Sequence, residues 1–168
     1  MNTQTGVARF SAGFLALLSS AIALGQVPPD PLQVRAIAEV ESKSVDAGRG
    51  RAVVKLIPAD RVVPGDRVIY TVEARNTGAT ALDTPVVTYA VPDHMRYVVD
   101  SAVGPGAEVR FSIDGGHHFD RAENLKLRGP DGRPRAVVGA DITHIRWQLK
   151  NSLKANSVAF VRFRALVQ

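Results

Sequence analysis

Apolar and polar side chains alternate with a period of two along much of the chain beyond residue 31. The alternation is regular in segment 32–40, where every second position is apolar. It returns in segment 67–75, where the apolar positions are Val68, Tyr70, Val72 and Ala74. A period of two places successive side chains on opposite faces of an extended chain. The pattern therefore predicts β-strands that bury one face.

Turn-forming residues separate these segments. Pro64 presets the first central position of a tight turn, and Gly65 before Asp66 accepts a positive φ at the second. Asn76 and Gly78 are expected to form the turn that ends the strand before them. Further strands are expected at 52–57, 85–90, 95–99, 108–113, 125–127, 142–149 and 159–167.

The arrangement of these segments predicts the fold class. No segment after Gly25 keeps a helical period of 3.6 for three turns. Eight to ten short strands, separated by Gly, Pro, Asn and Asp turns, favour an all-β, immunoglobulin-like β-sandwich. We expect residues 32–168 to form a single domain of this kind.

The first 25 residues are typical of a secretory signal peptide. Arg9 is the only charged residue before Asp30, an apolar run spans 10–24, and Gly25 completes a small-x-small cleavage pattern. Residues 26–31 then form a proline-rich spacer. The alternative is an uncleaved membrane anchor. Cleavage predicts an exported chain without a transmembrane span, located in the periplasm, at the cell surface or in the extracellular space.

Composition narrows the possible chemistry. The absence of cysteine excludes disulfides, thiolate metal sites and a cysteine nucleophile. The net charge of +5, which becomes +4 without Arg9, favours acidic surfaces such as an acidic polysaccharide. The charges are scattered singly, so most of them are expected to form a solvated surface. No basic stripe indicates nucleic-acid binding.

Three stretches of sequence together resemble a known bacterial family. They are "VPGDRVIYTVEARNTG" at 63–78, "PVVTYAVPDHMRYV" at 85–98, and "IRWQL" with "LKANSVAFVRFRALV" between 145 and 167. In their order and spacing they resemble the domain of unknown function 11 family, over about residues 62–167. The resemblance implies an exported, immunoglobulin-like module of surface proteins, with no agreed catalytic residues. The basic segment Arg121–Arg135 departs from the family pattern.

The stretch "SIDGGHHF" at 112–119 has the spacing of the Asp-box found in sialidases. In that pattern Ser112 and Asp114 bond to backbone groups of a turn, Gly116 takes a positive φ, and Phe119 packs beneath. All four duties are structural. A sialidase needs several such boxes on a much longer chain, so we interpret this one as a hairpin turn.

The histidines offer the alternative interpretation of the same stretch. His117 and His118 are adjacent, so on a strand they point to opposite faces and do not easily bind one metal ion. A site would need one of them together with His94, His144, Asp114 or Asp120, brought close by folding. We expect no metal and no cofactor; a periplasmic ligand- or metal-binding protein that uses His94, His117 and His118 remains the alternative.

No catalytic pattern is present. The chain lacks a Gly-x-Ser-x-Gly elbow and a glycine-rich loop that opens a helix. Tyr70 and Trp147 lie on apolar faces, so core packing is favoured over a sugar-stacking surface. His144, Arg146 and Gln148 form a polar row that is expected to face outward.

These observations predict a non-catalytic module with a structural, adhesive or protein-interaction role. Edge strands of a sandwich can accept a strand from another chain. Segment 32–41, after the proline-rich spacer, is the candidate for such pairing, with another envelope protein or a second copy.

Overall fold

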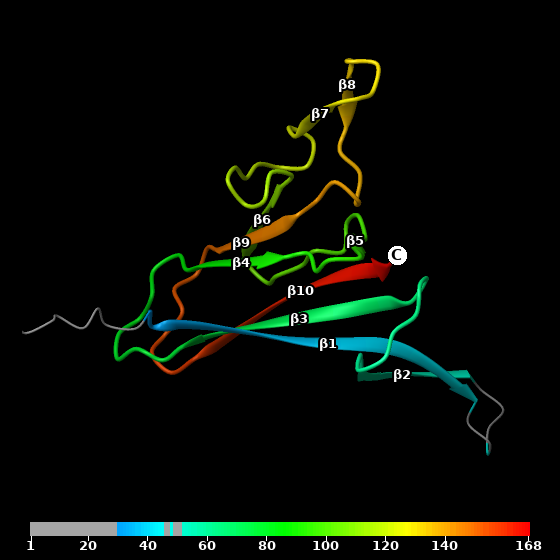
Figure 1. Ribbon diagram of the computed structural model, residues 1–168. Helices are drawn as coiled ribbons and strands as arrows, with labels where there is room; N and C mark the ends of the chain where they lie inside the picture. The colour runs from blue at the N-terminus through cyan, green and yellow to red at the C-terminus, as the bar shows by residue number, and fades with distance from the viewer. Residues whose placement is uncertain (1–29, 46–47, 49–51) are drawn as a thin grey trace, which may run out of the picture.

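The computed structural model describes residues 30–45, 48 and 52–168, and every regular element in this part is a β-strand (Figure 1). The ten strands are β1 (Leu32–Val45), β2 (Ala52–Pro58), β3 (Arg67–Asn76), β4 (Val86–Ala90), β5 (Met95–Tyr97), β6 (Ala107–Ser112), β7 (Lys126–Arg128), β8 (Pro134–Ala136), β9 (His144–Leu149) and β10 (Val158–Val167). The all-β prediction is confirmed. The predicted signal peptide and most of the proline-rich spacer lie outside the described residues.

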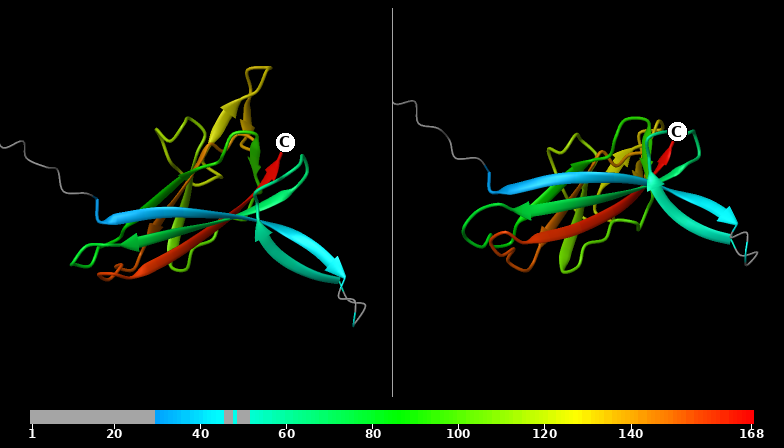
Figure 2. Two further views of the ribbon diagram at one scale, coloured as in Figure 1. Left: turned by 60° about the horizontal axis from the view of Figure 1, so that its bottom comes forward. Right: turned by 90° about the horizontal axis from the view of Figure 1, so that it is seen from below.

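The strands form three antiparallel sheets. The largest has the order β2-β1-β3-β10-β5, the second has the order β4-β9-β6, and the third is the pair β7-β8. Figure 1 shows the three-stranded sheet lying over the five-stranded one, with β7 and β8 projecting away from both. In the two views of Figure 2, β2 and the end of β1 extend beyond the neighbouring strands of their sheet.

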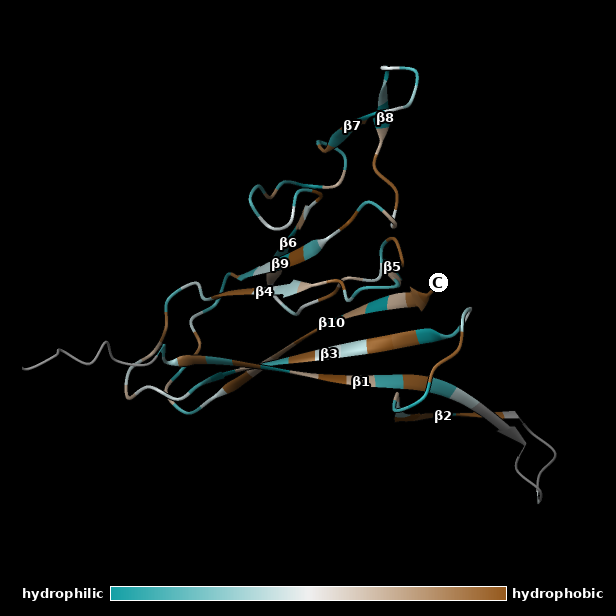
Figure 3. Cartoon of the chain, viewed as in Figure 1, coloured by the Kyte–Doolittle hydropathy of each residue, from teal (hydrophilic) through white to brown (hydrophobic). Residues whose placement is uncertain are grey.

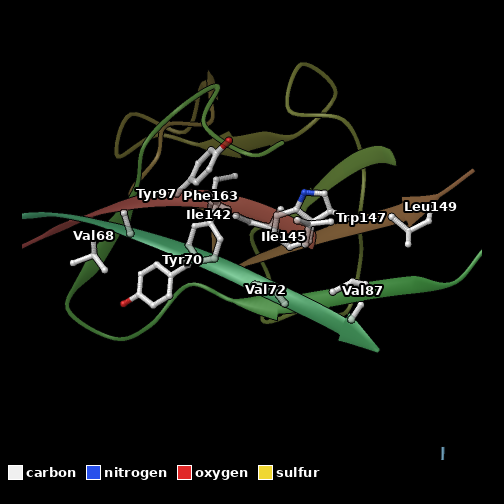
Figure 4. Packing of buried hydrophobic residues seen from close by; sticks show 13 residues of the cluster. Val68, Tyr70, Val72, Val87, Tyr97, Ile142, Ile145, Trp147, Leu149 and Phe163 are labelled. Carbon is white, nitrogen blue, oxygen red and sulfur yellow. The ribbon is translucent and has the colours of Figure 1, made fainter. Parts of the chain in front are cut away.

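The core lies between the two larger sheets (Figure 4). Phe163 of β10 is fully buried, and its ring stacks on Tyr70 of β3 at a centroid distance of 4.8 Å. Across the interface, the ring of Trp147 on β9 lies 6.2 Å from that of Phe163. The core positions predicted for Tyr70 and Trp147 are confirmed by their burial. Neither side chain is available for stacking against a sugar.

The hydropathy of the strands follows their place in the fold. Figure 3 shows hydrophobic stretches on β3, β9 and β10, whereas β7 and β8 are largely hydrophilic. All three residues of β8 are exposed. In the described part of the chain, no helix has the length and apolar character needed to cross a bilayer.

Candidate functional site

Strand β1 is paired on both sides for only a short part of its length. Strand β3 pairs with Leu32–Val40, whereas β2 pairs with Glu39–Val45. From Leu32 to Ile37, no strand of the described chain lies on the side of β1 that faces away from β3. We call Leu32–Ile37 the free edge. The expected pairing segment, 32–41, is therefore too long, because residues 39–41 are already paired with β2.

The phase of the ladder shows which backbone groups the free edge presents. The amide of Thr77 donates to the carbonyl of Pro31 at 2.8 Å. Because antiparallel bonding alternates along a strand, Gln33 and Arg35 bond to β3, while Val34 and Ala36 direct their N–H and C=O groups away from it. Directly after the free edge ends, the carbonyl of Ala38 also points away from β3 and accepts the amide of Ala59 at 3.0 Å, which agrees with this phase.

The side chains of the free edge leave it open to another strand. Val34 is 44% exposed and Ile37 is 40% exposed. Natural proteins often protect an edge with lysine, proline or a bulge. The free edge has no lysine and no proline, and its only charged side chain is Arg35. The Asp30 carboxylate accepts the amide of Leu32 at 2.9 Å, so one end of the edge is already capped.

The turn after β6 contains the sequence "SIDGGHHF". The hydroxyl of Ser112 donates to Asp114 Oδ1 at 2.7 Å and accepts the amide of Gly116 at 2.9 Å. The same Asp114 oxygen accepts the amide of His118 at 3.0 Å. Gly116 has a φ of 89°, in the region that favours glycine. The ring of Phe119 lies under a guanidinium group, 3.6 Å from its centroid. The Ser112 hydroxyl and both oxygens of the Asp114 carboxylate are therefore bonded within the turn.

Hydrogen bonding makes this turn sensitive to acid. The amide of His118, the hydroxyl of Ser112 and the ring of His118 hold the pKa of the Asp114 carboxyl well below its usual range. A carboxyl group whose pKa is lower in the folded state stabilises the fold above its unfolded pKa, near 4, and loses that effect as the pH falls further.

We therefore expect the destabilisation caused by Asp114→Asn to be largest above about pH 5 and to decline progressively below about pH 4. Urea unfolding of both proteins between pH 7 and pH 2 measures this difference. A difference that stays constant or grows toward low pH would contradict the assignment.

The structure does not bring the histidines together into a metal site. His94 precedes β5 in the five-stranded sheet and has a φ of 61°, whereas His117 and His118 follow β6 in the other large sheet. His118 Nδ1 lies 2.6 Å from Asp114 Oδ2. Within the described ranges, no three His, Cys, Asp or Glu side chains are placed to share a metal ion.

The turn at Pro64, between β2 and β3, is hydrogen-bonded to the last strand of the chain. Gly65 has a φ of 96°, and the amide of Asp66 donates to the carbonyl of Val63 at 3.0 Å. The Asp66 carboxylate accepts the Val63 amide in return, at 2.9 Å. The amide of Gly65 also donates to Val167 O at 2.9 Å, so the turn is fixed to β10.

Asn76 has a larger structural role than its place in a predicted turn indicated. It is fully buried, and its Oδ1 accepts the amide of Gly78 at 2.9 Å. Its Nδ2 lies within hydrogen-bond distance of the carbonyls of Thr80 at 2.8 Å, Leu153 at 2.9 Å and Lys154 at 3.1 Å. The local sequence carries no sign of the contacts with residues 153 and 154.

The polar row on β9 is less open than expected. The Arg146 guanidinium lies over the Phe119 ring, and its Nε donates to Thr88 Oγ1 at 3.2 Å. His144 Nδ1 lies 3.2 Å from Thr143 Oγ1. Of these three side chains, His144 and Arg146 are half-buried and only Gln148 is exposed. The row therefore packs partly on its own neighbours.

Comparison with known proteins adds no relative: no family model, no curated protein and no solved structure matches this chain. The resemblance to the domain of unknown function 11 family stays a prediction from the sequence. The free edge of β1 is the feature of the described fold with the clearest capacity for interaction.

Proposed function

We propose that this protein is an exported, non-catalytic module of the cell envelope or extracellular space, with an immunoglobulin-like β-sandwich fold, that associates through the free edge of β1. Its role is structural or adhesive. The observation that carries the proposal is the pair of outward-directed backbone units at Val34 and Ala36. The signal-peptide pattern of residues 1–25 supports export.

We favour one register for a second copy of the chain at this edge. Two identical strands that pair antiparallel are related by a two-fold axis. Because the outward N–H and C=O groups belong to Val34 and Ala36, one of these residues must lie at or beside that axis. Centring the axis on Arg35 would place two arginines opposite each other, and centring it on Ala36 would run the incoming strand into Ala59, which already bonds to Ala38. Centring it on Val34 sets Gln33 opposite Arg35 of the other copy, without like charges.

This register allows a modest interaction energy. Two bonds would join the Val34 units, and two more would join each Ala36 amide to the Leu32 carbonyl of the other copy. Four backbone hydrogen bonds contribute on the order of 2–6 kcal/mol in total. Association costs at least about 4 kcal/mol, so strand pairing alone gives a weak complex that burial of Val34 strengthens. We therefore expect reversible, concentration-dependent dimers.

Sedimentation velocity over a range of protein concentrations tests the proposal. Val34→Pro removes an amide that β3 does not use, and proline is tolerated where the N–H faces solvent. This variant should remain folded by circular dichroism and sediment as a monomer. Val34→Thr, which keeps the amide, is the matched control and should still dimerise.

Two substitutions at Gln33 test the register without altering the backbone. Gln33→Glu should strengthen the dimer, because the new carboxylate faces Arg35 of the other copy, while Gln33→Arg should weaken it. Unchanged dimerisation in Val34→Pro, or a monomeric wild-type protein at the highest concentration, would refute the proposed association.

A further inference from the structure

The outward face of β10 carries a second surface that shares no residue with the free edge. Phe160, Arg162, Arg164 and Leu166 alternate along this face. Residues two apart on a strand lie about 7 Å from each other. Phe160 is 53% exposed, and both arginines are exposed. The strand lies between β3 and β5 in the five-stranded sheet (Figure 1).

Neighbouring strands add two more arginines to the same face. Leu166 pairs with Arg67 of β3 on one side and with Arg96 of β5 on the other. Paired residues in adjacent strands point to the same face, about 5 Å apart. Arg67 and Arg96 therefore flank Leu166, Arg164 is the next outward residue along β10, and Arg162 lies one step further. We call these four arginines, together with Phe160, the arginine face.

The positive charge of the arginine face is not neutralised locally. None of its four arginines forms an ion pair with a carboxylate within the described ranges; Arg162 Nε donates to Thr71 Oγ1 at 3.1 Å. Ion pairs are made instead by the arginines at 75, 110, 121, 133 and 135. Two carboxylates lie on the same face. Glu73 forms an ion pair with Arg75 at 2.9 Å, and Glu39 of β1 is separated from Arg164 of β10 by Ile69 of β3, which lies between them.

An apolar hollow adjoins these charges. Phe160 and Arg162 line it together with Thr71, Val103 and Pro105, and its volume is about 160 Å³. Val103 is bridged to Arg162 and is itself more than half exposed. An aromatic ring beside a row of guanidinium groups combines an apolar surface for a sugar ring with donors for its carboxylate.

We propose that the arginine face binds a linear acidic polysaccharide whose sugars carry carboxylates. The guanidinium groups bind successive carboxylates in paired hydrogen bonds, and one sugar ring packs on Phe160. Arg162 and Arg164 follow β10 in a step of about 7 Å, and Arg67 and Arg96 flank the next outward position, Leu166, so the charges form a row that fits a chain with repeated charge better than a single small anion. The proposal goes beyond association at β1 and can fail independently of it.

Binding of the full-length protein to immobilised polygalacturonate tests the proposal, with neutral dextran as the reference polymer. We expect binding to polygalacturonate alone, weakening as salt rises. The double variant Arg162→Gln/Arg164→Gln should bind at least about tenfold more weakly. The control Arg128→Gln/Arg133→Gln removes the same charge from the end of β7 and the turn before β8, and it should bind within about twofold of wild type.

Phe160→Ala separates stacking from charge. It should weaken binding about threefold to tenfold at every salt concentration, with the salt dependence unchanged. Equal losses in the two double variants would show that net charge alone attracts the polymer and would overturn the proposal. Tighter binding to vesicles of anionic phospholipid than to polygalacturonate would overturn it as well, as would absence of binding to polygalacturonate.

Discussion

Replacing Phe163 by alanine is expected to lower the free energy of unfolding by about 4 kcal/mol. The ring is fully buried between the two larger sheets. It contacts Tyr70 at 4.8 Å, Tyr89 at 5.8 Å and Trp147 at 6.2 Å between ring centroids. Alanine removes these contacts and leaves a cavity that rigid strands on both sides cannot close.

Urea unfolding measures this loss, and Phe160→Ala provides a matched control. Phe160 lies on the same strand, three residues earlier, but its side chain is 53% exposed. The control should cost less than about 1 kcal/mol, because surface substitutions are usually small in effect. A loss below about 1.5 kcal/mol for Phe163→Ala would show that the sheets do not pack on this ring.

Asn76→Ala should cost about 3 kcal/mol. The side-chain amide serves carbonyls in two loops that are far apart in the sequence, with Thr80 between β3 and β4 and Leu153 between β9 and β10. Alanine removes this donor from both carbonyls. The Leu153 carbonyl keeps the amide of Leu82 at 2.9 Å, whereas the Thr80 carbonyl loses the Asn76 amide inside the protein, where an unsatisfied polar group costs about 1–3 kcal/mol. The amide of Gly78 loses its acceptor at the same time.

A second substitution at this position separates lost donors from lost volume. Asn76→Asp keeps the shape but turns an acceptor toward the three carbonyls, so it should destabilise the protein at least as much as alanine at pH 7. Asn151→Ala, at an exposed asparagine, is the control and should change stability by less than about 0.5 kcal/mol. A milder effect for aspartate than for alanine would contradict the role assigned to the Nδ2 donors.

The sequence predicted best those strands that bury one regular face. In β3 and β10 the inward positions are apolar because the opposite sheet covers them, and this produces the period of two. Strand β8 was missed because its three residues, Pro134–Ala136, are all exposed and begin with proline. The far end of β1 was missed as well: Ser42, Lys43 and Ser44 show no apolar alternation, and their strand geometry comes from pairing with β2.

The candidate interaction site could be predicted only in part. Alternation in segment 32–40 predicted a strand. The length of that strand left without a second neighbour depends on where β2 stops pairing with it, and this is set by the change of chain direction after Pro58. Outward Ile69 illustrates the same dependence on distant contacts. It lies on the polar face of β3 and is nevertheless only 3% exposed, between neighbours from β1 and β10. The local alternation of apolar and polar residues does not predict such contacts with distant strands.

Amide hydrogen exchange along β1 tests association through the free edge most directly. In dilute protein, the amides of Val34 and Ala36 should exchange at least about a hundredfold faster than those of Gln33 and Arg35, which bond to β3. As the protein concentration rises through the range of association, Val34 and Ala36 should gain protection while Gln33 and Arg35 change little. Equal protection of all four amides in the monomer, or exchange at Val34 and Ala36 that does not depend on concentration, would contradict the account.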